Sequence, residues 1–370
     1  MKKLIWLLAA SALSWSVASS AKDLSGMRWD EVLTQAKAEK TVVWYQWYFQ
    51  DRFRETVKSF EKQYGIKVRI TEGGHQSNLQ KLIVEKNRKQ GDIDVISLSG
   101  SDLAKIKAKE VLTGPLKNRL PDGQVLRYKI EGVDNHGMAP AFWGNQTGIA
   151  YNPLLIAEKD LPQTTEDFSA YIKAHPGSFG LNAENGGSGP GFIQSIARNM
   201  LPEIDFKTAE PSQQVMQAFQ PVWDWFNHRK SDYVITVSNI DSLNRVNGGE
   251  LALAPAWEDQ LAGLQKKGEL SGKLKFYIPA IKMPGGGNVV AIPRNAAHPA
   301  AALVFIHWLT SSQTQSELNR VYGSAPQHPQ ASDAFSLLSA KERQKSTDWA
   351  NKKLSDAIKA GFINEVSLHD

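Results

Sequence analysis

The sequence contains no cysteine among its 370 residues. The chain therefore has no disulfide bonds and no thiolate metal ligands, and its hydrophobic core alone must hold it together. It also lacks the thiol that attachment of a lipid to the N-terminus would require. The 8 histidines are scattered along the chain, so the sequence gives little support for a metal site, and no cofactor is expected.

An excess of one charge is also missing. The chain carries 43 Lys and Arg against 38 Asp and Glu, which gives a formal net charge of +5. Lys2 and Lys3 contribute to this excess, and the other acidic and basic residues are interleaved along the chain. Such interleaving is typical of a solvated surface rather than of a nucleic-acid-binding face, so nucleic acid is not an expected partner.

Long apolar runs are absent after the first residues. A short basic start precedes the almost wholly apolar residues 4–17, and small residues follow at positions 19–21. A membrane anchor is the alternative, but the run is too short to cross a bilayer comfortably and no stop-transfer pattern follows it. The pattern predicts an export signal over residues 1–21, cleaved after Ala21.

The rest of the chain has the composition and length of a folded protein with two domains. Hydrophobic residues make up 41% and charged residues 22% of the sequence. Short β-branched and aromatic runs at residues 41–47, 66–70 and 93–97 alternate with helical patterns, which predicts an α/β lobe built on a parallel sheet. Ligands of such sheets bind at the carboxyl ends of the strands.

The second half of the sequence predicts further strands and the connections between two lobes. Residues 138–153 and 274–279 are strand-like, a glycine turn is expected at residues 285–287, and a strand follows at residues 289–293. A helix is expected to begin at Pro299. Since no disordered linker interrupts the chain, we expect two lobes joined by strands, with crossovers near residues 145–152 and 275–282.

Four segments in order resemble the extracellular solute-binding proteins of ATP-driven importers. Residues 143–152 (WGNQTGIAYN) are similar to the family's first hinge strand, and residues 248–257 (GGELALAPAW) are similar to its second-lobe strand. Residues 290–296 (VAIPRNA) with the following helix look like the return to the first lobe, and residues 322–327 (YGSAPQ) complete the pattern. The resemblance is greatest to the group that contains polyamine, thiamine and ferric-iron receptors.

This resemblance implies a two-lobed periplasmic-binding-protein fold of type II-like α/β architecture, with a cleft between lobes joined by two crossover strands. It places residues 22–147 and 280–370 in the first lobe and residues 148–279 in the second. The implied function is capture of a small solute in the periplasm and delivery to the permease of an importer. A monomer without enzymatic activity is expected, and its lobes close around the solute.

Aromatic residues are the first candidates for ligand contacts. Trp47 and Tyr48 follow the first strand, Trp143 precedes the first hinge, and Trp257 ends a second-lobe strand. Aromatic faces from two lobes suit a flat ring or an organic cation, although packing in the core is the alternative for each.

Two carboxylates carry the prediction of a cationic ligand. Trp257, Glu258 and Asp259 resemble a turn of the polyamine receptors in which an aromatic residue precedes an acid that neutralises an amine. An ordinary helix N-terminus is the alternative, because acids are common there. Asn288 stands where polyamine receptors tend to carry an acid, which argues against a long diamine, and the paired tyrosines of the iron receptors are absent from the sequence.

The glycine-rich segment at residues 185–191 supports an anionic ligand as the alternative. Backbone N–H groups at the start of a helix can bind phosphate or carboxylate, with Ser188 and Gly189 as the expected contacts. Further polar candidates are His75, Ser99, Ser101 and Asn145. The sequence therefore predicts an organic cation such as thiamine or a polyamine, with a phosphorylated or carboxylated solute as the alternative.

The sequence gives less support to two other function classes. A periplasmic enzyme is the rival, but the sequence shows no nucleophile elbow, metal-binding helix or Walker-type phosphate loop. An interaction module fits poorly with a cleft lined by tryptophan.

Overall fold

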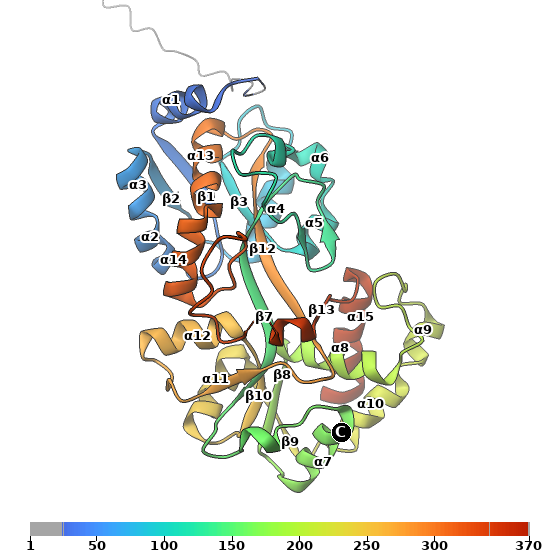
Figure 1. Cartoon of the computed structure of the whole chain (residues 1–370). Helices are drawn as coiled ribbons and strands as arrows, with labels where there is room; N and C mark the ends of the chain where they lie inside the picture. The colour runs from blue at the N-terminus through green and yellow to red at the C-terminus, as the bar shows by residue number, and fades with distance from the viewer. Residues whose placement is uncertain (1–23, 25, 340, 369–370) are drawn as a thin grey trace, which may run out of the picture.

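The computed structural model describes residue 24, residues 26–339 and residues 341–368, so the predicted export signal lies outside the described residues. Figure 1 shows an upper and a lower α/β lobe, with the long strands β7 and β12 running between them. This two-lobed arrangement confirms the predicted fold class. None of the helices in the described ranges is both long and apolar enough to cross a membrane.

The first lobe contains most elements before β7 and two helices after β12. Its helices are α1 (Trp29–Glu39), α2 (Gln50–Thr56), α3 (Lys58–Tyr64), α4 (His75–Glu85), α5 (Gly100–Lys105), α6 (Ala108–Val111), α13 (Pro299–Thr310) and α14 (Ser312–Tyr322). Its strands are β1 (Thr41–Tyr45), β2 (Lys67–Ile70), β3 (Val95–Leu98), β4 (Leu112–Thr113), β5 (Lys129–Ile130) and β6 (Val133–Asp134).

The second lobe lies mainly between β7 and β12 in the sequence. Its helices are α7 (Thr165–Ala174), α8 (Ser188–Met200), α9 (Gln213–Gln217), α10 (Gln220–Asn227), α11 (Asn239–Gly248), α12 (Glu258–Lys267) and α15 (Lys352–Phe362). Its strands are β8 (Phe179–Asn185), β9 (Tyr233–Ser238), β10 (Leu253–Trp257) and β11 (Lys275–Tyr277). The strands between the lobes are β7 (Ala141–Tyr151), β12 (Met283–Pro293) and β13 (Ser346–Thr347).

One mixed sheet runs through both lobes in the order β2-β1-β3-β12-β7-β10-β8-β9. The strands β2, β1 and β3 are parallel, and so are β10, β8 and β9. The two halves meet where β7 and β12 pair antiparallel at the centre of the sheet. Because each of these two strands is long enough to enter both lobes, they form the hinge between them.

The expected glycine turn at residues 285–287 is wrong, because these glycines lie inside β12. Gly285, Gly286 and Gly287 pair with Gln146, Asn145 and Gly144 of β7. A side chain at Gly287 would approach the Trp143 carbonyl oxygen to 2.2 Å, so a close backbone approach explains glycine at this position better than a turn does.

Separate hydrophobic cores stabilise the two lobes. Buried side chains of β1, α2, α3 and α13 form the larger cluster of the first lobe. The second-lobe cluster contains β8, β10, α8 and α10, and it also contains Leu354, Ile358 and Phe362 of α15. The helix α15 therefore packs on the second lobe, whereas the sequence placed all of residues 280–370 in the first; the remaining lobe boundaries stay a prediction.

The C-terminal segment thus crosses between the lobes a third time. After α14 of the first lobe, β13 pairs parallel with the start of β12, and the chain then enters α15. The last α-helix, α15, begins at Lys352, after this crossing.

Candidate functional site

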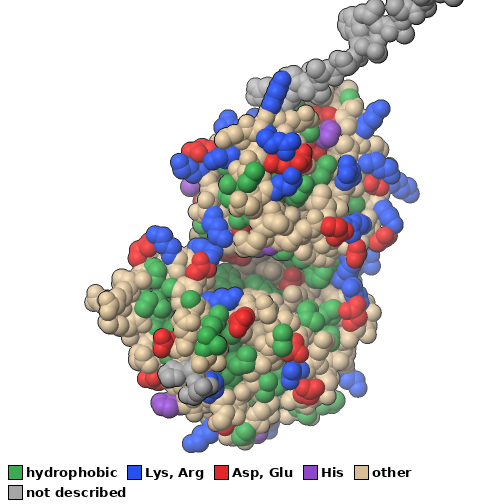
Figure 2. Space-filling model, turned by 180° about the vertical axis from the view of Figure 1, so that it is seen from behind, with side chains coloured by type: hydrophobic (Ala, Val, Ile, Leu, Met, Phe, Trp, Pro, Cys, Tyr) green, Lys and Arg blue, Asp and Glu red, His purple; other side chains and the backbone are tan. Residues whose placement is uncertain are grey.

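A cavity of about 650 Å³ lies between the lobes, and we call it the cleft cavity. Figure 2 shows the molecular surface hollowed between the upper and lower lobes. The first lobe contributes Trp47, His75, Ser99, Ser101 and Glu131 to its wall. The second lobe contributes Lys207, Trp257, Asp348, Trp349 and Lys352. Its volume is in the usual range for a small-molecule site.

The first-lobe wall is built at the carboxyl ends of β1, β2 and β3, as the sequence predicts. Trp47 follows β1 and stacks on the His75 ring, with the ring centroids 4.3 Å apart and the planes at 20°. His75 Nε2 lies 2.5 Å from Asp102 Oδ2. Ser99 caps α5 and accepts a hydrogen bond from the Asp102 backbone N–H. The wall is therefore held in place by contacts among its own residues.

Asp102 anchors this wall and is fully buried. Desolvation alone would raise the pKa of Asp102, but hydrogen bonds from His75 and Ser99 outweigh it and hold the pKa below its usual value. The carboxylate is therefore committed to positioning His75 and the start of α5 rather than free to bind a solute.

The second-lobe wall presents two indole rings. Trp257 ends β10, and Trp349 follows β13, so the two residues come from distant parts of the chain. Their ring centroids lie 6.1 Å apart with an interplanar angle of 31°. Together with Trp47 and His75, these rings place aromatic faces on both sides of the cleft cavity.

Glu131 brings a carboxylate to the cavity. It lies in the two-residue turn between β5 and β6, where Glu131 has φ of 51° and Gly132 has φ of 82°. Positive φ at both positions is the requirement of a type I′ hairpin turn. Glu131 Oε2 accepts a hydrogen bond from the Ser101 backbone N–H at 3.3 Å.

The environment of Glu131 disfavours its charge. Desolvation raises the pKa of Glu131 to about 7, and the backbone N–H groups of Ser101 and Gly100 offset only part of that rise. Within the described ranges, no Lys, Arg or His forms an ion pair with Glu131. A carboxylate in this position would be stabilised by a partner of opposite charge, because such a partner favours the ionised form.

The lysines of the cavity wall already have partners. Lys207 pairs with Asp348 at 3.1 Å, and Lys352 pairs with Asp356. Lys359 Nζ donates a hydrogen bond to the Glu184 carbonyl oxygen at 2.6 Å. These contacts leave Glu131 as the carboxylate of the cavity wall with the least compensation.

A second cavity between the lobes, of about 640 Å³, lies along the hinge strands, and we call it the hinge cavity. Its wall includes Asn145, Gly286 and Arg127, and it shares Glu131 and Asp348 with the cleft cavity. Asn145 Oδ1 is buried and has no hydrogen-bond partner within the part of the chain that the structure describes.

Four of the predicted site residues lie elsewhere, in a buried aromatic cluster of the first lobe and its edge. Trp143 is only 1% exposed, and the centroid of its ring lies 5.4 Å from that of the Tyr48 ring. The Tyr48 hydroxyl donates to Asn288 Oδ1 at 2.7 Å, and Trp143 Nε1 donates to Asp259 Oδ2 at 2.9 Å. These residues hydrogen-bond one another, although Asp259 Oδ1 has no partner among the described residues, and none of them is on the wall of the cleft cavity.

Asp259 and Glu258 are buried at the start of α12. Desolvation raises the pKa of Asp259 to about 6 despite the hydrogen bond from Trp143. Glu258 Oε1 pairs with Arg343 at 2.7 Å and accepts the backbone N–H groups of Leu337 and Leu338. Glu258 therefore stabilises the contact between α12 and the C-terminal segment, and the structure does not bring either acid to the cavity.

The predicted anion-binding loop is divided: Gly186 and Gly187 line the cleft cavity, but the predicted contacts Ser188 and Gly189 are part of the core. Ser188 and Gly189 form the first turn of α8 and are buried. Ser188 Oγ hydrogen-bonds Asn182 Oδ1 at 2.9 Å and Asn239 Oδ1 at 2.7 Å. A Cβ at Gly189 would lie 1.6 Å from the Asn182 carbonyl oxygen, so this glycine allows close packing of α8 on β8.

Sequence reasoning missed Glu131 and Trp349. The Glu-Gly pair between two short strands is a hairpin-turn signal that would have placed Glu131 at a loop tip. Trp349 had no comparable signal, since its position depends on the third crossing of the chain between the lobes. The predicted residues that do line a cavity are Trp47, His75, Ser99, Ser101, Trp257 and, in the hinge cavity, Asn145.

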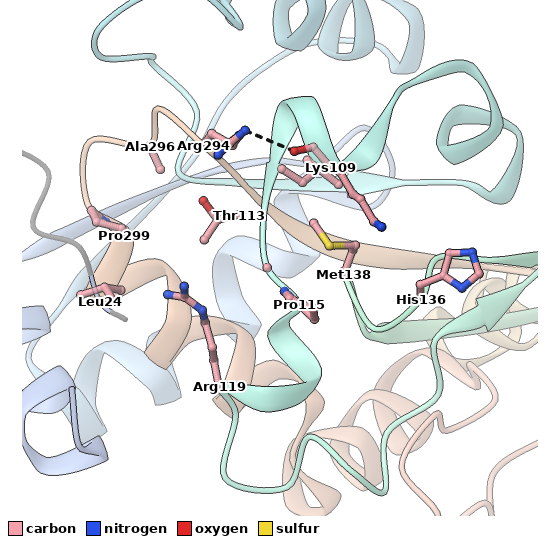
Figure 3. A pocket seen from close by; sticks show the side chains of 12 residues that line it. Leu24, Lys109, Thr113, Pro115, Arg119, His136, Met138, Arg294, Ala296 and Pro299 are labelled. Atoms are coloured by element: carbon pink, nitrogen blue, oxygen red, sulfur yellow. Dashed lines mark hydrogen bonds between the residues drawn. The ribbon is translucent and has the colours of Figure 1, made fainter. Parts of the chain in front are cut away.

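Another cavity, of about 640 Å³, lies in the first lobe alone (Figure 3). Lys109, Arg119 and Arg294 line it, and Arg294 Nη1 donates to the Lys109 carbonyl oxygen at 3.3 Å. Because only one lobe contributes to its wall, movement of the lobes would leave this cavity unchanged. A solute that favours a closed form must instead contact both lobes, as it would in the cleft cavity.

The described residues contain no cluster of side chains that would support a metal site. No group of three or more His, Asp or Glu side chains is placed to hold a metal ion there. Tyr277, the only tyrosine near the second crossover, donates its hydroxyl hydrogen bond to the Pro162 carbonyl oxygen.

Comparison with known proteins agrees with the architecture. The profile of the family described as bacterial extracellular solute-binding protein matches residues 55–351. A Fe(3+)-binding periplasmic protein of Serratia marcescens is 24% identical over 288 residues, covering 76% of each chain.

Two solved structures show the same fold. Iron-bound HitA from Pseudomonas aeruginosa has a TM-score of 0.64 and 20% identity, covering 86% of this chain and 98% of its own. The spermidine/putrescine substrate-binding protein PotD from Streptococcus pneumoniae has a TM-score of 0.66 and 14% identity, covering 88% of this chain and 98% of its own.

Proposed function

The chain belongs to the bacterial extracellular solute-binding proteins, and we propose that it captures an organic cation between its lobes for delivery to an ATP-driven importer. The observation that carries this proposal is Glu131, a carboxylate with a pKa raised to about 7 on a cavity wall that also presents aromatic rings. A cationic group would complete the charge balance that the protein leaves open.

The aromatic rings favour an organic cation over a simple inorganic one. Trp47 and His75 face the cavity from the first lobe, and Trp257 and Trp349 face it from the second. Cations bound over indole faces gain about 0.5–2 kcal/mol, and the same faces bury the apolar parts of the ligand. Thiamine and polyamines both combine a positive nitrogen with such apolar parts, and a polyamine is consistent with the name of the structurally similar PotD.

The alternative is a phosphorylated or carboxylated solute. Lys207, Lys352 and Lys359 line the second-lobe wall and are the groups that would bind its anion. Each would have to exchange the partner it has in the structure, whereas Glu131 has no ion pair in the described residues to lose. The charge distribution therefore supports the cation.

Closure of the lobes is the proposed signal to the permease. A solute bound to Glu131 and Trp257 contacts both lobes at once, so it binds the closed form more tightly and shifts the population toward it. We propose that the protein acts as a monomer in the periplasm after cleavage of residues 1–21. It performs no chemistry on its solute.

Native mass spectrometry of protein purified from the periplasm of its own host tests the proposal, followed by denaturation to identify any released molecule. We expect one molecule of an amine or a thiamine-like cation for each chain. A thermal-shift panel of amines, thiamine, sugar phosphates and carboxylates provides the second readout, with Glu131→Gln as the matched variant.

The outcomes separate the two candidate ligands. A shift by amines or thiamine that Glu131→Gln abolishes supports the cation. A shift by phosphates or carboxylates, unaffected by Glu131→Gln, replaces it with the anionic solute. Turnover of any solute in the panel would overturn the receptor function itself.

A further inference from the structure

The cavity of Figure 3, which we call the first-lobe cavity, differs from the two cavities between the lobes in the charge of its wall. It has a volume of about 640 Å³ and is lined by Lys109, Arg119 and Arg294. Its described wall contains no Asp or Glu, whereas Glu131 and Asp348 line both cavities between the lobes. A hollow lined by charges of one sign concentrates counter-ions, so this wall favours an anion.

The protein leaves these three cations without a carboxylate partner. Lys109, Arg119 and Arg294 form no ion pair with any residue in the described ranges; of the ionisable residues on the wall, only His136 has an acidic neighbour there, with Nδ1 3.9 Å from Asp134 Oδ1. The hydrogen bond from Arg294 Nη1 to the Lys109 carbonyl oxygen uses one of the five N–H donors of this guanidinium. The remaining donors are available to a ligand.

The two arginines come from segments that are far apart in the sequence. Arg119 follows a short 3-10 helix at Leu116–Asn118, and Arg294 follows β12. Figure 3 shows their side chains on opposite sides of Thr113, whereas the Lys109 side chain extends toward Met138. Guanidinium groups bind phosphate oxygens through pairs of parallel N–H groups, so Arg119 and Arg294 are the expected phosphate ligands.

The rest of the wall suits an organic body attached to the anion. Leu112, Met138, Ala296 and Pro299 add apolar surface to the same cavity. Its volume is in the range of complete small-molecule sites and far exceeds that of one phosphate group. The chemistry of the wall therefore fits a phosphomonoester of a small organic molecule better than a bare inorganic ion.

This cavity is separate from the movement of the lobes. All of its described lining residues belong to the first lobe, so its shape is the same in the open and closed forms. A ligand with equal affinity for two forms shifts no equilibrium between them, however tightly it binds. A ligand of the first-lobe cavity is therefore neither the transported solute nor a regulator of closure.

We propose that the first-lobe cavity is a second binding site, which takes an organic phosphomonoester on Arg119 and Arg294 and is occupied independently of the solute in the cleft cavity. Such a phosphate can belong to a soluble metabolite or to a lipid headgroup. Both present the same terminal group to the two arginines. A lipid would hold the receptor at a membrane surface through its first lobe while the lobes remain free to close.

Calorimetry of the mature protein with glycerol 3-phosphate at low ionic strength tests the site. We expect one bound molecule for each chain and no binding of glycerol. Arg119→Gln and Arg294→Gln should each weaken binding about tenfold; both side chains reach solvent, so both variants are expected to fold. Arg69→Gln removes the same charge from an exposed position of β2 and should change the affinity less than twofold. No binding to the unchanged protein, or equal losses in all three variants, would overturn the inference.

Lys207→Gln separates this site from an anion in the cleft cavity. Lys207 lines the cleft cavity, so its loss should leave glycerol 3-phosphate binding unchanged. Binding that is lost in Lys207→Gln and kept in Arg119→Gln would place the anion in the cleft and overturn the inference. The sugar phosphates of the thermal-shift panel need the same comparison, because only a shift that persists in Arg119→Gln bears on the solute of the cleft.

Asp23 requires a test of its own, because it precedes Leu24 of the cavity wall and lies outside the described residues. Asp23→Asn should bind glycerol 3-phosphate within about threefold of the unchanged protein. Binding that appears only in Asp23→Asn would show that the chain neutralises its own arginines, and it would overturn the inference.

Vesicles distinguish the two sources of the phosphate. Flotation with phosphatidic acid vesicles, lost in Arg119→Gln and absent with phosphatidylcholine, would support a lipid headgroup. Glycerol 3-phosphate binding without flotation would support a soluble phosphomonoester. Saturating glycerol 3-phosphate should change the affinity for a cleft solute less than twofold, and a larger change would contradict independent occupancy. If no amine binds but glycerol 3-phosphate does, the proposed cation function fails and this site remains.

Discussion

The raised pKa of Glu131 predicts that solute binding depends steeply on pH. With a pKa of about 7, the carboxylate is about 90% ionised at pH 8 and about 1% ionised at pH 5. A cation that binds only the ionised form should therefore lose about two orders of magnitude in affinity between these values. The affinity rises with pH because a protonated carboxyl group offers the cation no charge.

Proton release gives the same prediction a second readout. Below pH 7 most Glu131 side chains carry a proton that the arriving cation must displace, so binding at pH 6 should release close to one proton. Calorimetry of an alkylamine that binds in the thermal-shift panel, in two buffers with different ionisation enthalpies, measures that number directly. Alkylamines remain fully charged over pH 5–8, so the ligand contributes no titration of its own.

Controls must separate Glu131 from its charged and ionisable neighbours. His75 and Asp102 act electrostatically on Glu131, and Asp348 lines the same cavities. Glu131→Gln should bind weakly at all pH values with a flat profile, whereas Asp259→Asn, away from the cavity wall, should keep the slope. His75→Gln should also keep it. A flat profile in the unchanged protein, or an unchanged slope in Glu131→Gln, would refute the reasoning.

Further substitutions separate residues that stabilise the fold from those that bind. Trp257→Ala should weaken amine binding about 2- to 30-fold through the lost indole face, measured by calorimetry; an unchanged affinity would remove the ring from the site. Glu258→Gln breaks the pair with Arg343 and should lower the free energy of unfolding in urea by about 1–3 kcal/mol, with amine affinity unchanged within about twofold. Ser188→Ala should cost a similar amount of stability, and a selective loss of phosphate binding instead would restore the predicted anion loop. Desolvation raises the pKa of Asp259 in the folded state to about 6, so its ionisation opposes folding: Asp259→Asn should gain stability relative to the unchanged protein as the pH rises from 4 to 7, and a constant difference would contradict this.

The sequence predicts best the features that depend on neighbours along the chain. The strands near residues 41–47 and 66–70 and the helix from Pro299 follow from local periodicity, and the structure has β1, β2 and α13 there. Trp47 and Ser99 line the cleft cavity because a parallel sheet brings the carboxyl ends of its strands together.

Contacts between distant segments account for the errors. Tryptophan is a residue type that often contacts ligands, but the indole N–H of Trp143 donates its hydrogen bond to Asp259, a residue 116 positions away. Glu258 resembles a ligand carboxylate in its local sequence, yet its partner Arg343 arrives with the third crossing between the lobes. No local pattern reveals which acid will be paired and which, like Glu131, will be left without a cation.

The candidate site also explains why binding and hinge motion should be coupled in this protein. Glu131 belongs to a first-lobe hairpin and Trp257 to a second-lobe strand, while Gly286 lies on the hinge strand that joins them. Each tenfold preference of the solute for the closed form contributes about 1.4 kcal/mol to closure. Because Glu131 and Trp257 stand on different lobes, loss of either side chain is expected to weaken both the affinity and the shift of the population toward the closed form.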